Sequence, residues 1–175
     1  MTKGKTNERV VAKKLEQWWR EIEPEALFMR VPQSGGWGTP AIREEFRASG
    51  DVMTTSKTFP YSVEVKRRER WDETNLLNGR KSPVWSWWHQ SCIQAIEMKV
   101  EPMMFFRRNR KPWWIMMSQT EFSRLQWFQS MPAVVVFDFE VIEARLIDGD
   151  WIPVIVEAEV FFERIRPRFC ISVVE

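Results

Sequence analysis

The chain has few of the residues that build zinc sites. Two cysteines, Cys92 and Cys170, and one histidine occur among its 175 residues. The cysteines are far apart in the sequence, with no CxxC spacing, and a structural zinc ion takes four Cys or His ligands. The sequence therefore argues against a zinc protein, and we expect it to work in the reducing cytoplasm.

Long apolar stretches are also missing. The sequence contains no run of 18 apolar residues, so we expect neither a membrane-spanning helix nor a membrane partner. The polar N-terminal stretch does not resemble a signal peptide. Apolar residues nevertheless make up 44% of the chain, which excludes a disordered protein. A chain of 175 residues is long enough for one domain with a sizeable core.

Net charge is only +2, but the charges are unevenly distributed. Residues 1–81 carry 16 Lys or Arg against 12 Asp or Glu, a balance of +4, whereas residues 82–175 carry 10 against 12, a balance of −2. A nucleic-acid surface is therefore expected mainly on the N-terminal part. Ordinary scatter of surface charge explains the same numbers. The 11 tryptophans exceed normal usage, and they provide either core or surfaces on which bases stack.

The order of periodic segments predicts an α/β domain with a mixed sheet. Val11, Leu15 and Trp18 recur at helical spacing and predict a helix over residues 7–22. A short strand, two adjacent antiparallel strands, a helix and two more strands are predicted in turn over residues 26–31, 50–53, 61–66, 84–99, 103–106 and 113–117. The segments 133–146 and 151–162 are also predicted to be β-structure.

Two carboxylates and a lysine fall on the predicted strand pair. Glu64 and Lys66 are two residues apart and share a face of their strand, where Asp51 of the neighbouring strand can meet them. Two converging carboxylates repel each other unless a cation lies between them. Oxygen ligands favour Mg²⁺ or Mn²⁺, and the backbone carbonyl of Val65 adds one more. Such a metal would activate a water and neutralise a scissile phosphate, with Lys66 stabilising the phosphate or orienting the water.

Each of these features has a simpler interpretation. An E-x-K pattern is common, and the three residues also fit a cross-strand ion pair on a solvated sheet. Glu8 lies beneath the apolar stripe of the first helix, and it fits either an active-site acid or a residue that interacts with the helix dipole. The three glycines within residues 35–38 allow close approach of the backbone to a ligand, or simply make a flexible loop.

Taken together, the motifs resemble the PD-(D/E)XK nuclease superfamily and, within it, the Holliday junction resolvases of archaea and phages. The resemblance covers roughly residues 3–117. It rests on Glu8-Arg9, Arg30-Val31-Pro32-Gln33-Ser34-Gly35, Gly50-Asp51-Val52 and Glu64-Val65-Lys66, with Gln90 as the candidate for a polar helix position. Gly50 stands where the family often has proline, and residues 37–49 lengthen the loop.

The resemblance implies a fold and an activity. The fold is α/β, a restriction-endonuclease-like core with a central mixed sheet flanked by helices over residues 1–117, and a β-rich C-terminal extension over residues 118–175. The activity is that of a Mg²⁺-dependent endonuclease, with Mn²⁺ as a substitute, that resolves four-way DNA junctions by paired cuts as a homodimer. A restriction-like or repair nuclease and a non-catalytic DNA-binding module are the alternatives.

The resemblance also assigns roles to residues. Glu8, Asp51 and Glu64 hold the metal or lie close to it, together with the Val65 carbonyl, while Lys66 is the catalytic lysine. Ser34 contacts the scissile phosphate. The expected DNA contacts are Arg9, Arg30, Lys3, Lys5, Arg67, Arg68 and Gln90. For Arg67 and Arg68 a solvated loop is an equal alternative, and for residues 107–111 a solvated turn is slightly favoured. Trp37 is a candidate for stacking at an opened junction.

Overall fold

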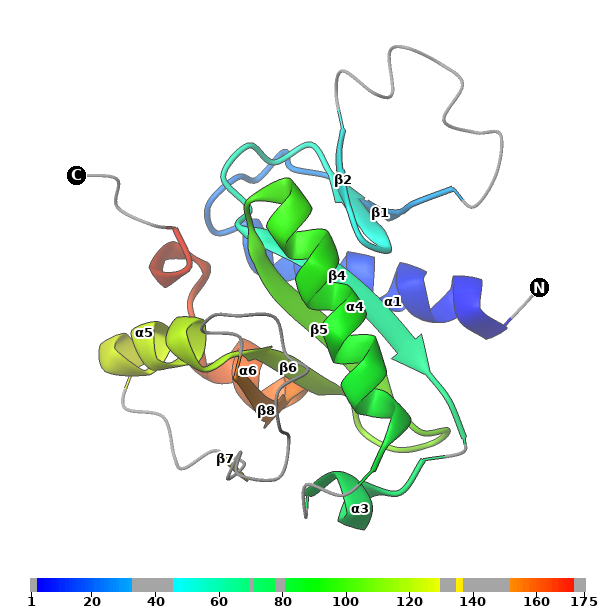
Figure 1. The fold of residues 1–175 in the computed structure, drawn as a ribbon. Coiled ribbons are helices and arrows are strands. Elements are labelled where there is room, and N and C mark those ends of the chain that lie inside the picture. Colours follow the sequence, from blue (N-terminus) through cyan, green and yellow to red (C-terminus); the bar gives the residue numbers. More distant parts are fainter. Residues whose placement is uncertain are drawn as a thin grey trace.

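A five-stranded mixed sheet forms the centre of the computed structural model, which describes residues 3–32, 46–69, 71–77, 81–129, 135–136 and 152–171 (Figure 1). The strand order is β4-β5-β6-β8-β7. Their bounds are Tyr61–Arg67 for β4, Glu101–Arg107 for β5, Trp114–Ser118 for β6, Pro153–Glu157 for β8 and Val135–Val136 for β7. β4 and β5 run parallel, and the other pairs are antiparallel. β4 is therefore an edge strand of this sheet.

A small antiparallel sheet lies beside the edge formed by β4. Its order is β1-β3-β2, with β1 at Phe28–Arg30, β3 at Val52–Thr54 and β2 at Arg47–Ser49. The pairing register places Met29 and Ala48 on either side of Met53. This small sheet brings Asp51, which directly precedes β3, next to the edge of β4.

Helices cover both faces of the central sheet. Residues of α1 (Lys3–Trp19), α5 (Gln119–Gln129) and α6 (Ala158–Arg164) belong to one core cluster. On the other face, α4 (Pro83–Met98) and α3 (Glu73–Leu77) form a second cluster with the sheet. Figure 1 shows α4 and α1 crossing the sheet on opposite sides. The short 3-10 helix η3 (Pro167–Phe169) follows α6. This arrangement confirms the predicted α/β class with a mixed sheet flanked by helices.

Alternation along the strands creates the two cores. Met103 and Phe105 of β5 pack with α1, while Met104 and Phe106 pack with α4. Such continuous apolar strands are expected where both faces of a sheet are covered. On the edge strand β4 the alternation is different: Val63 faces the α1 core, but the opposite face carries polar residues.

The ends of three elements explain where prediction succeeded and failed. α4 begins as expected, because Ser82 caps it and Pro83 occupies its first turn, and Lys99 ends it in the left-handed region at φ 55°. α1 begins at Lys3 rather than residue 7. Trp19 is fully buried, and Trp18 at the edge of the predicted apolar stripe is half-buried and packs against the core. The predicted β-structure over residues 151–162 is a strand only to Glu157 and continues as α6.

β8 lies within the central sheet, between β6 and β7. The division of the chain at residue 117 into a nuclease core and a C-terminal extension stays a prediction, and strands from the two segments share one sheet. Among the helices of the described ranges, none is long and apolar enough to cross a lipid bilayer.

Candidate active site

Asp51 reaches β4 through its backbone. Its N–H donates to the Val63 carbonyl at 2.7 Å, and Gly50 and Val63 form an isolated parallel bridge. The predicted antiparallel pairing of this segment with β4 is therefore wrong. β3 finds its antiparallel partners in β1 and β2 instead. The connection from Thr54 of β3 to Tyr61 of β4 is a loop, within which the Ser56 hydroxyl accepts the Phe59 N–H at 3.0 Å.

The close approach of this segment to β4 requires a glycine at position 50. Its φ is +72°, a conformation that side chains disfavour, and a Cβ atom there would lie 2.3 Å from the Val63 carbonyl oxygen. Proline cannot adopt a positive φ. The replacement of the family's proline by glycine thus follows from how this chain passes the edge of β4.

The Asp51 side chain is fixed against the same strand. Its Oδ2 atom accepts the Val65 N–H at 2.8 Å. The N–H and C=O groups of one strand residue point to the same side, so the Val65 carbonyl also points to the edge of β4 that faces Asp51. A carboxylate and a backbone carbonyl are therefore directed to one place, as the sequence predicted for these two residues.

Glu64 and Lys66 lie on the α4 side of β4. The Glu64 side chain is only 5% exposed, and its Oε1 atom forms an ion pair with the Lys66 ammonium, which is 20% exposed. Alternation along the strand puts both on the face opposite Val63 and Val65. The predicted sharing of one face is thus present in the structure.

The electrostatics of the cluster show an excess of negative charge. Burial raises the pKa of Asp51, against the opposing effects of the Val65 N–H and Lys66. Burial also raises the pKa of Glu64, and the negative charges of Asp51 and Glu8 raise it further, while the ion pair with Lys66 lowers it. Lys66 therefore offsets only part of the repulsion among the three acids.

Glu8 joins this cluster from α1. It is 8% exposed, and its charge acts on Glu64. Since α1 begins at Lys3, Glu8 lies beyond the first turn, where the helix dipole has little effect. The interpretation as a helix-dipole residue therefore does not fit. Its neighbour Asn7 accepts a hydrogen bond from Arg107 Nη2 at 2.9 Å.

The residues predicted to contact DNA belong to several different elements. Arg9 is exposed on α1, and Arg68 is exposed just after β4. Arg30 Nη1 donates to the adjacent Val31 carbonyl at 3.2 Å. Arg67 donates from Nε to Asn109 Oδ1 in the turn between β5 and β6.

Several predicted residues cannot be placed by their side chains. Ser34 and Trp37 lie outside the described residues, and Lys3 and Lys5 lie in α1 with their side chains outside the described part. Their assigned contacts with DNA stay predictions.

On α4 the structure points to a different glutamine. Gln90 is exposed, whereas the Gln94 amide oxygen is buried without a hydrogen-bond partner among the described residues. Met98, one turn after Gln94, lines a cavity with Val52 and Tyr61, so this side of α4 faces β4. The buried Ser91 and Ser62 hydroxyls likewise lack described partners. Helical spacing places Gln90 and Gln94 on the same face, so the sequence carried no signal that distinguished them.

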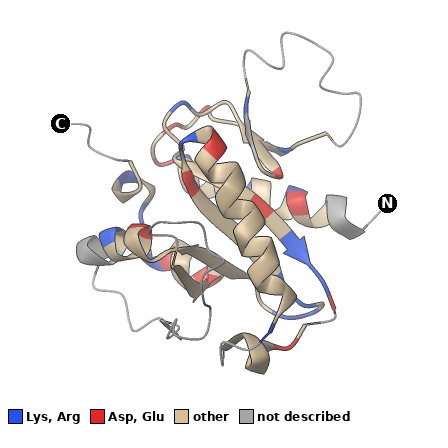
Figure 2. Cartoon of the chain, viewed as in Figure 1, with Lys and Arg blue, Asp and Glu red and all other residues tan. Residues whose placement is uncertain are grey.

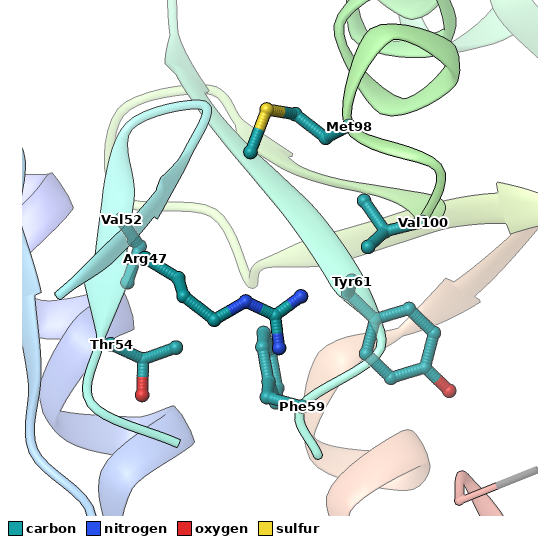
Figure 3. A pocket seen from close by; sticks show the side chains of 7 residues that line it. All are labelled: Arg47, Val52, Thr54, Phe59, Tyr61, Met98 and Val100. Atoms are coloured by element: carbon teal, nitrogen blue, oxygen red, sulfur yellow. The ribbon is translucent and has the colours of Figure 1, made fainter. Parts of the chain in front are cut away.

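That cavity is separate from the acidic cluster, because it lies at the N-terminal end of β4. Figure 3 shows the Arg47 side chain extending across it toward Phe59 and Tyr61. Arg47 Nη1 donates to the Lys57 carbonyl at 2.7 Å. We assign no part of the candidate active site to this cavity.

A metal ion at this site would need enough ligand atoms from the protein. Within the described ranges, no three His, Cys, Asp or Glu side chains are grouped so as to hold a metal by themselves. A hard divalent cation needs fewer, because it keeps several waters and takes one or two carboxylates. Asp51, Glu64 and the Val65 carbonyl form an all-oxygen set of this kind. The mutual repulsion of the two carboxylates is what a bound cation would relieve.

Sequence comparison identifies the family. The family model described as "Phage putative PDDEXK endonuclease" matches residues 1–161. The chain belongs to this endonuclease family. The restriction-endonuclease-like fold predicted from the motifs is thereby confirmed, and so is the membership of the PD-(D/E)XK superfamily.

Other comparisons are more distant. No protein of curated function matches the chain in sequence. One solved structure, Hjc, a Holliday junction resolvase from the archaeal hyperthermophile Archaeoglobus fulgidus, aligns over 86% of this chain and 93% of its own, with 12% identity and a TM-score of 0.27. A likeness of that size supports no conclusion about substrate.

Proposed function

We propose that this nuclease is a Mg²⁺-dependent endodeoxyribonuclease that cuts branched DNA, with the four-way junction as its substrate. The observation that carries the proposal is the meeting of Asp51, Glu64 and Lys66 at the open edge of β4. Asp51 is fixed by the Val65 N–H, and Glu64 is buried beside Lys66. Membership of an endonuclease family supports phosphodiester hydrolysis as the reaction.

The positions of the side chains support the following roles in catalysis. Asp51, Glu64 and the Val65 carbonyl would hold the cation, and Glu8 would add negative charge behind Glu64. The cation, when bound, supplies an activated water and neutralises charge on the scissile phosphate. Mn²⁺ should substitute, because it accepts the same oxygen ligands.

Lys66 has two partners in this proposal, Glu64 and the scissile phosphate. Its ammonium forms an ion pair with Glu64. Glu64 would share its carboxylate between Lys66 and the cation. Lys66 would then be available to donate to a phosphate oxygen as charge builds there.

The preference for a junction and the action as a homodimer rest on the sequence resemblance. The segment from Arg30 to Gly35 and the pair Glu8-Arg9 match the resolvase pattern. Paired cuts on opposed strands need two active sites, and a dimer with twofold symmetry provides them.

The test is a cleavage assay with a labelled four-way junction beside a linear duplex of the same sequence, each with Mg²⁺ and with EDTA. We expect Mg²⁺-dependent paired nicks in the junction while the duplex is spared. Sequence-dependent cutting of the linear duplex would instead identify a restriction-like enzyme. No cutting of either DNA, or of other branched substrates, would contradict the proposal and favour a non-catalytic DNA-binding module.

A further inference from the structure

A group of basic side chains surrounds the end of the sheet next to the candidate active site. The turn between β5 and β6 carries four basic residues in five positions, Arg107-Arg108-Asn109-Arg110-Lys111. Because β4 and β5 are parallel, this turn and the segment after Lys66 emerge at the same end of the sheet. Figure 2 shows the basic residues of both segments side by side there.

The strand register places this turn close to the active site. Lys66 pairs with Phe106, and Arg67 pairs with Arg107. Neighbouring strands are about 4.8 Å apart, so Arg107 lies one strand away from the residue that follows Lys66. The basic turn therefore begins one residue beyond the level of the candidate catalytic lysine.

Hydrogen bonds attach the turn to both sides of the site. Arg67, next to Lys66, donates to Asn109 in the turn. Asn7, next to Glu8, accepts from Arg107, whose guanidinium also lies 4.3 Å from the Trp113 ring centroid. The turn is thus held in a fixed position relative to the acidic cluster, as a substrate-positioning element needs to be.

The positive charges of this region are poorly neutralised within the protein. Of the described residues, none forms an ion pair within 4 Å of Arg67, Arg68, Arg107, Arg108, Arg110 or Lys111. The nearby acids are Glu69, which is exposed, and Asp72, whose carboxylate accepts the Thr74 N–H at 2.7 Å. Arg108 acts on Asp72 only electrostatically.

The pKa of Arg107 is affected by the neighbouring positive charge. Burial lowers its pKa, and the positive charge of Arg67 lowers it further. Its buried Nε atom has no hydrogen-bond partner among the described residues. Cations that form no ion pair with the described acids are stabilised by an anionic partner, and DNA phosphate is the anion that a nuclease meets.

We infer that residues 107–111, together with Arg67 and Arg68, form a phosphate-binding surface that holds the DNA backbone beside the scissile bond. This inference rests on the proposed function for its partner, since it names where the substrate of that site is held. The contacts are to the backbone, so they position the duplex arms and read no sequence.

The experiment compares two pairs of substitutions in the full-length protein. Arg110→Gln/Lys111→Gln removes two positive charges from the turn. Lys57→Gln/Lys99→Gln removes two from the opposite end of the sheet. The pairs are matched, because all four side chains are exposed and each pair has one residue in the left-handed region, Arg110 at φ 58° and Lys99 at φ 55°.

Binding of a fluorescent four-way junction and of a linear duplex is measured in EDTA over a series of salt concentrations. We expect the turn variant to bind both DNAs roughly tenfold more weakly, with the slope of log K against log salt reduced by about 2. The control pair should match the wild type. In Mg²⁺, the turn variant should need roughly tenfold more DNA for half-maximal cutting than the control pair.

The outcomes separate this inference from the proposed function. Wild-type affinity and salt slope in the turn variant would overturn the inference, whether or not the protein cuts DNA. An equal loss in the control pair would overturn it too, because the effect would then be one of net charge. A wild type that binds DNA through the turn but never cuts it would contradict the proposed function and support the surface.

Discussion

Two buried glutamates lie on opposite faces of β4 and have different surroundings. Glu121 of α5 accepts a hydrogen bond from the Tyr61 hydroxyl at 2.6 Å and two from Arg124, each at 2.7 Å. Glu64 has Lys66 as its ion-pair partner and two further acids, Asp51 and Glu8, acting on it. Glu121 is therefore matched in charge and hydrogen bonding, whereas Glu64 belongs to a cluster with excess negative charge.

The comparison contrasts a structural carboxylate with the one proposed to be functional. The Glu121 network continues through Arg124 Nη1 to the Phe169 carbonyl at 2.6 Å, so it ties the C-terminal segment to β4. The cluster around Glu64 instead brings acids from α1 and from the segment before β3 to one strand. Acids concentrated in this way repel one another, which is the arrangement that the proposed cation would relieve.

The largest expected effect comes from neutralising Glu64. In Glu64→Gln we expect the Mg²⁺-dependent cutting rate to fall more than about a hundredfold, because even the outer partners of metal ligands contribute about 10- to 100-fold. The free energy of unfolding in EDTA should stay within about 1 kcal/mol of the wild type or rise, since an amide is cheaper to bury than a carboxylate beside Asp51. Cleavage assays and urea denaturation measure the two effects. A large loss of stability would make Glu64 a structural residue like Glu121.

Gly50→Ala should damage both fold and site. The left-handed conformation costs a residue with a side chain about 1–2 kcal/mol, and the new Cβ meets the Val63 carbonyl. We therefore expect a loss of at least about 2 kcal/mol in stability and a reduced cutting rate, because Asp51 must move away from β4. Thermal denaturation and cleavage are the measurements. An unchanged melting temperature would show that the backbone does not pass β4 in this way.

Glu121→Gln provides the opposite test. It weakens the bonds to Arg124 and leaves that partly buried guanidinium less well paired, so we expect a loss of about 1–3 kcal/mol in the free energy of unfolding. The cutting rate of the folded variant should equal that of the wild type. Urea denaturation and cleavage at a temperature where the variant is folded are the measurements. A selective loss of cutting would break the distinction between the two glutamates.

The smallest effect concerns pH in the absence of metal. Burial raises the pKa values of Asp51 and Glu64 in the folded protein, so their contribution to stability is present at low pH and is lost as pH rises through these raised values. The wild type in EDTA should therefore lose stability relative to Asp51→Asn as pH rises above about 4, the usual carboxylate value. Urea denaturation across that range measures it. A constant difference would contradict the repulsion between the two acids.

Much of the fold and the centre of the site could be predicted from the sequence. The E-x-K spacing predicted that the Glu64 and Lys66 side chains share one face of a strand, because side chains two residues apart on a strand point to the same side. Helical spacing gave α4, with Pro83 marking its start. What the pattern did not contain was the partner of each strand. β3 was expected to pair with β4, and it pairs with β1 and β2 because long-range pairing depends on packing.

Other features were hidden because their signals depend on three-dimensional context. Gln90 and Gln94 are one turn apart, and only the packing of α4 shows which one is buried. The charge balance directed attention to residues 1–81, whereas the basic turn at 107–111 lies in the half with a balance of −2. It joins the active-site end of the sheet because β5 runs parallel to β4, which no sum of charges reveals.

The central claim is that the acids at the edge of β4 hold the cation that cuts DNA, and Asp51→Asn tests it most directly. The asparagine amide oxygen still accepts the Val65 N–H, so the fold should be preserved. Cutting and binding of the four-way junction are measured with wild type and variant, with Mg²⁺ for cutting and EDTA for binding. We predict that the variant binds the junction as tightly as the wild type and does not cut it. Cutting at the wild-type rate would contradict the claim, and a joint loss of binding and cutting would make Asp51 a structural residue.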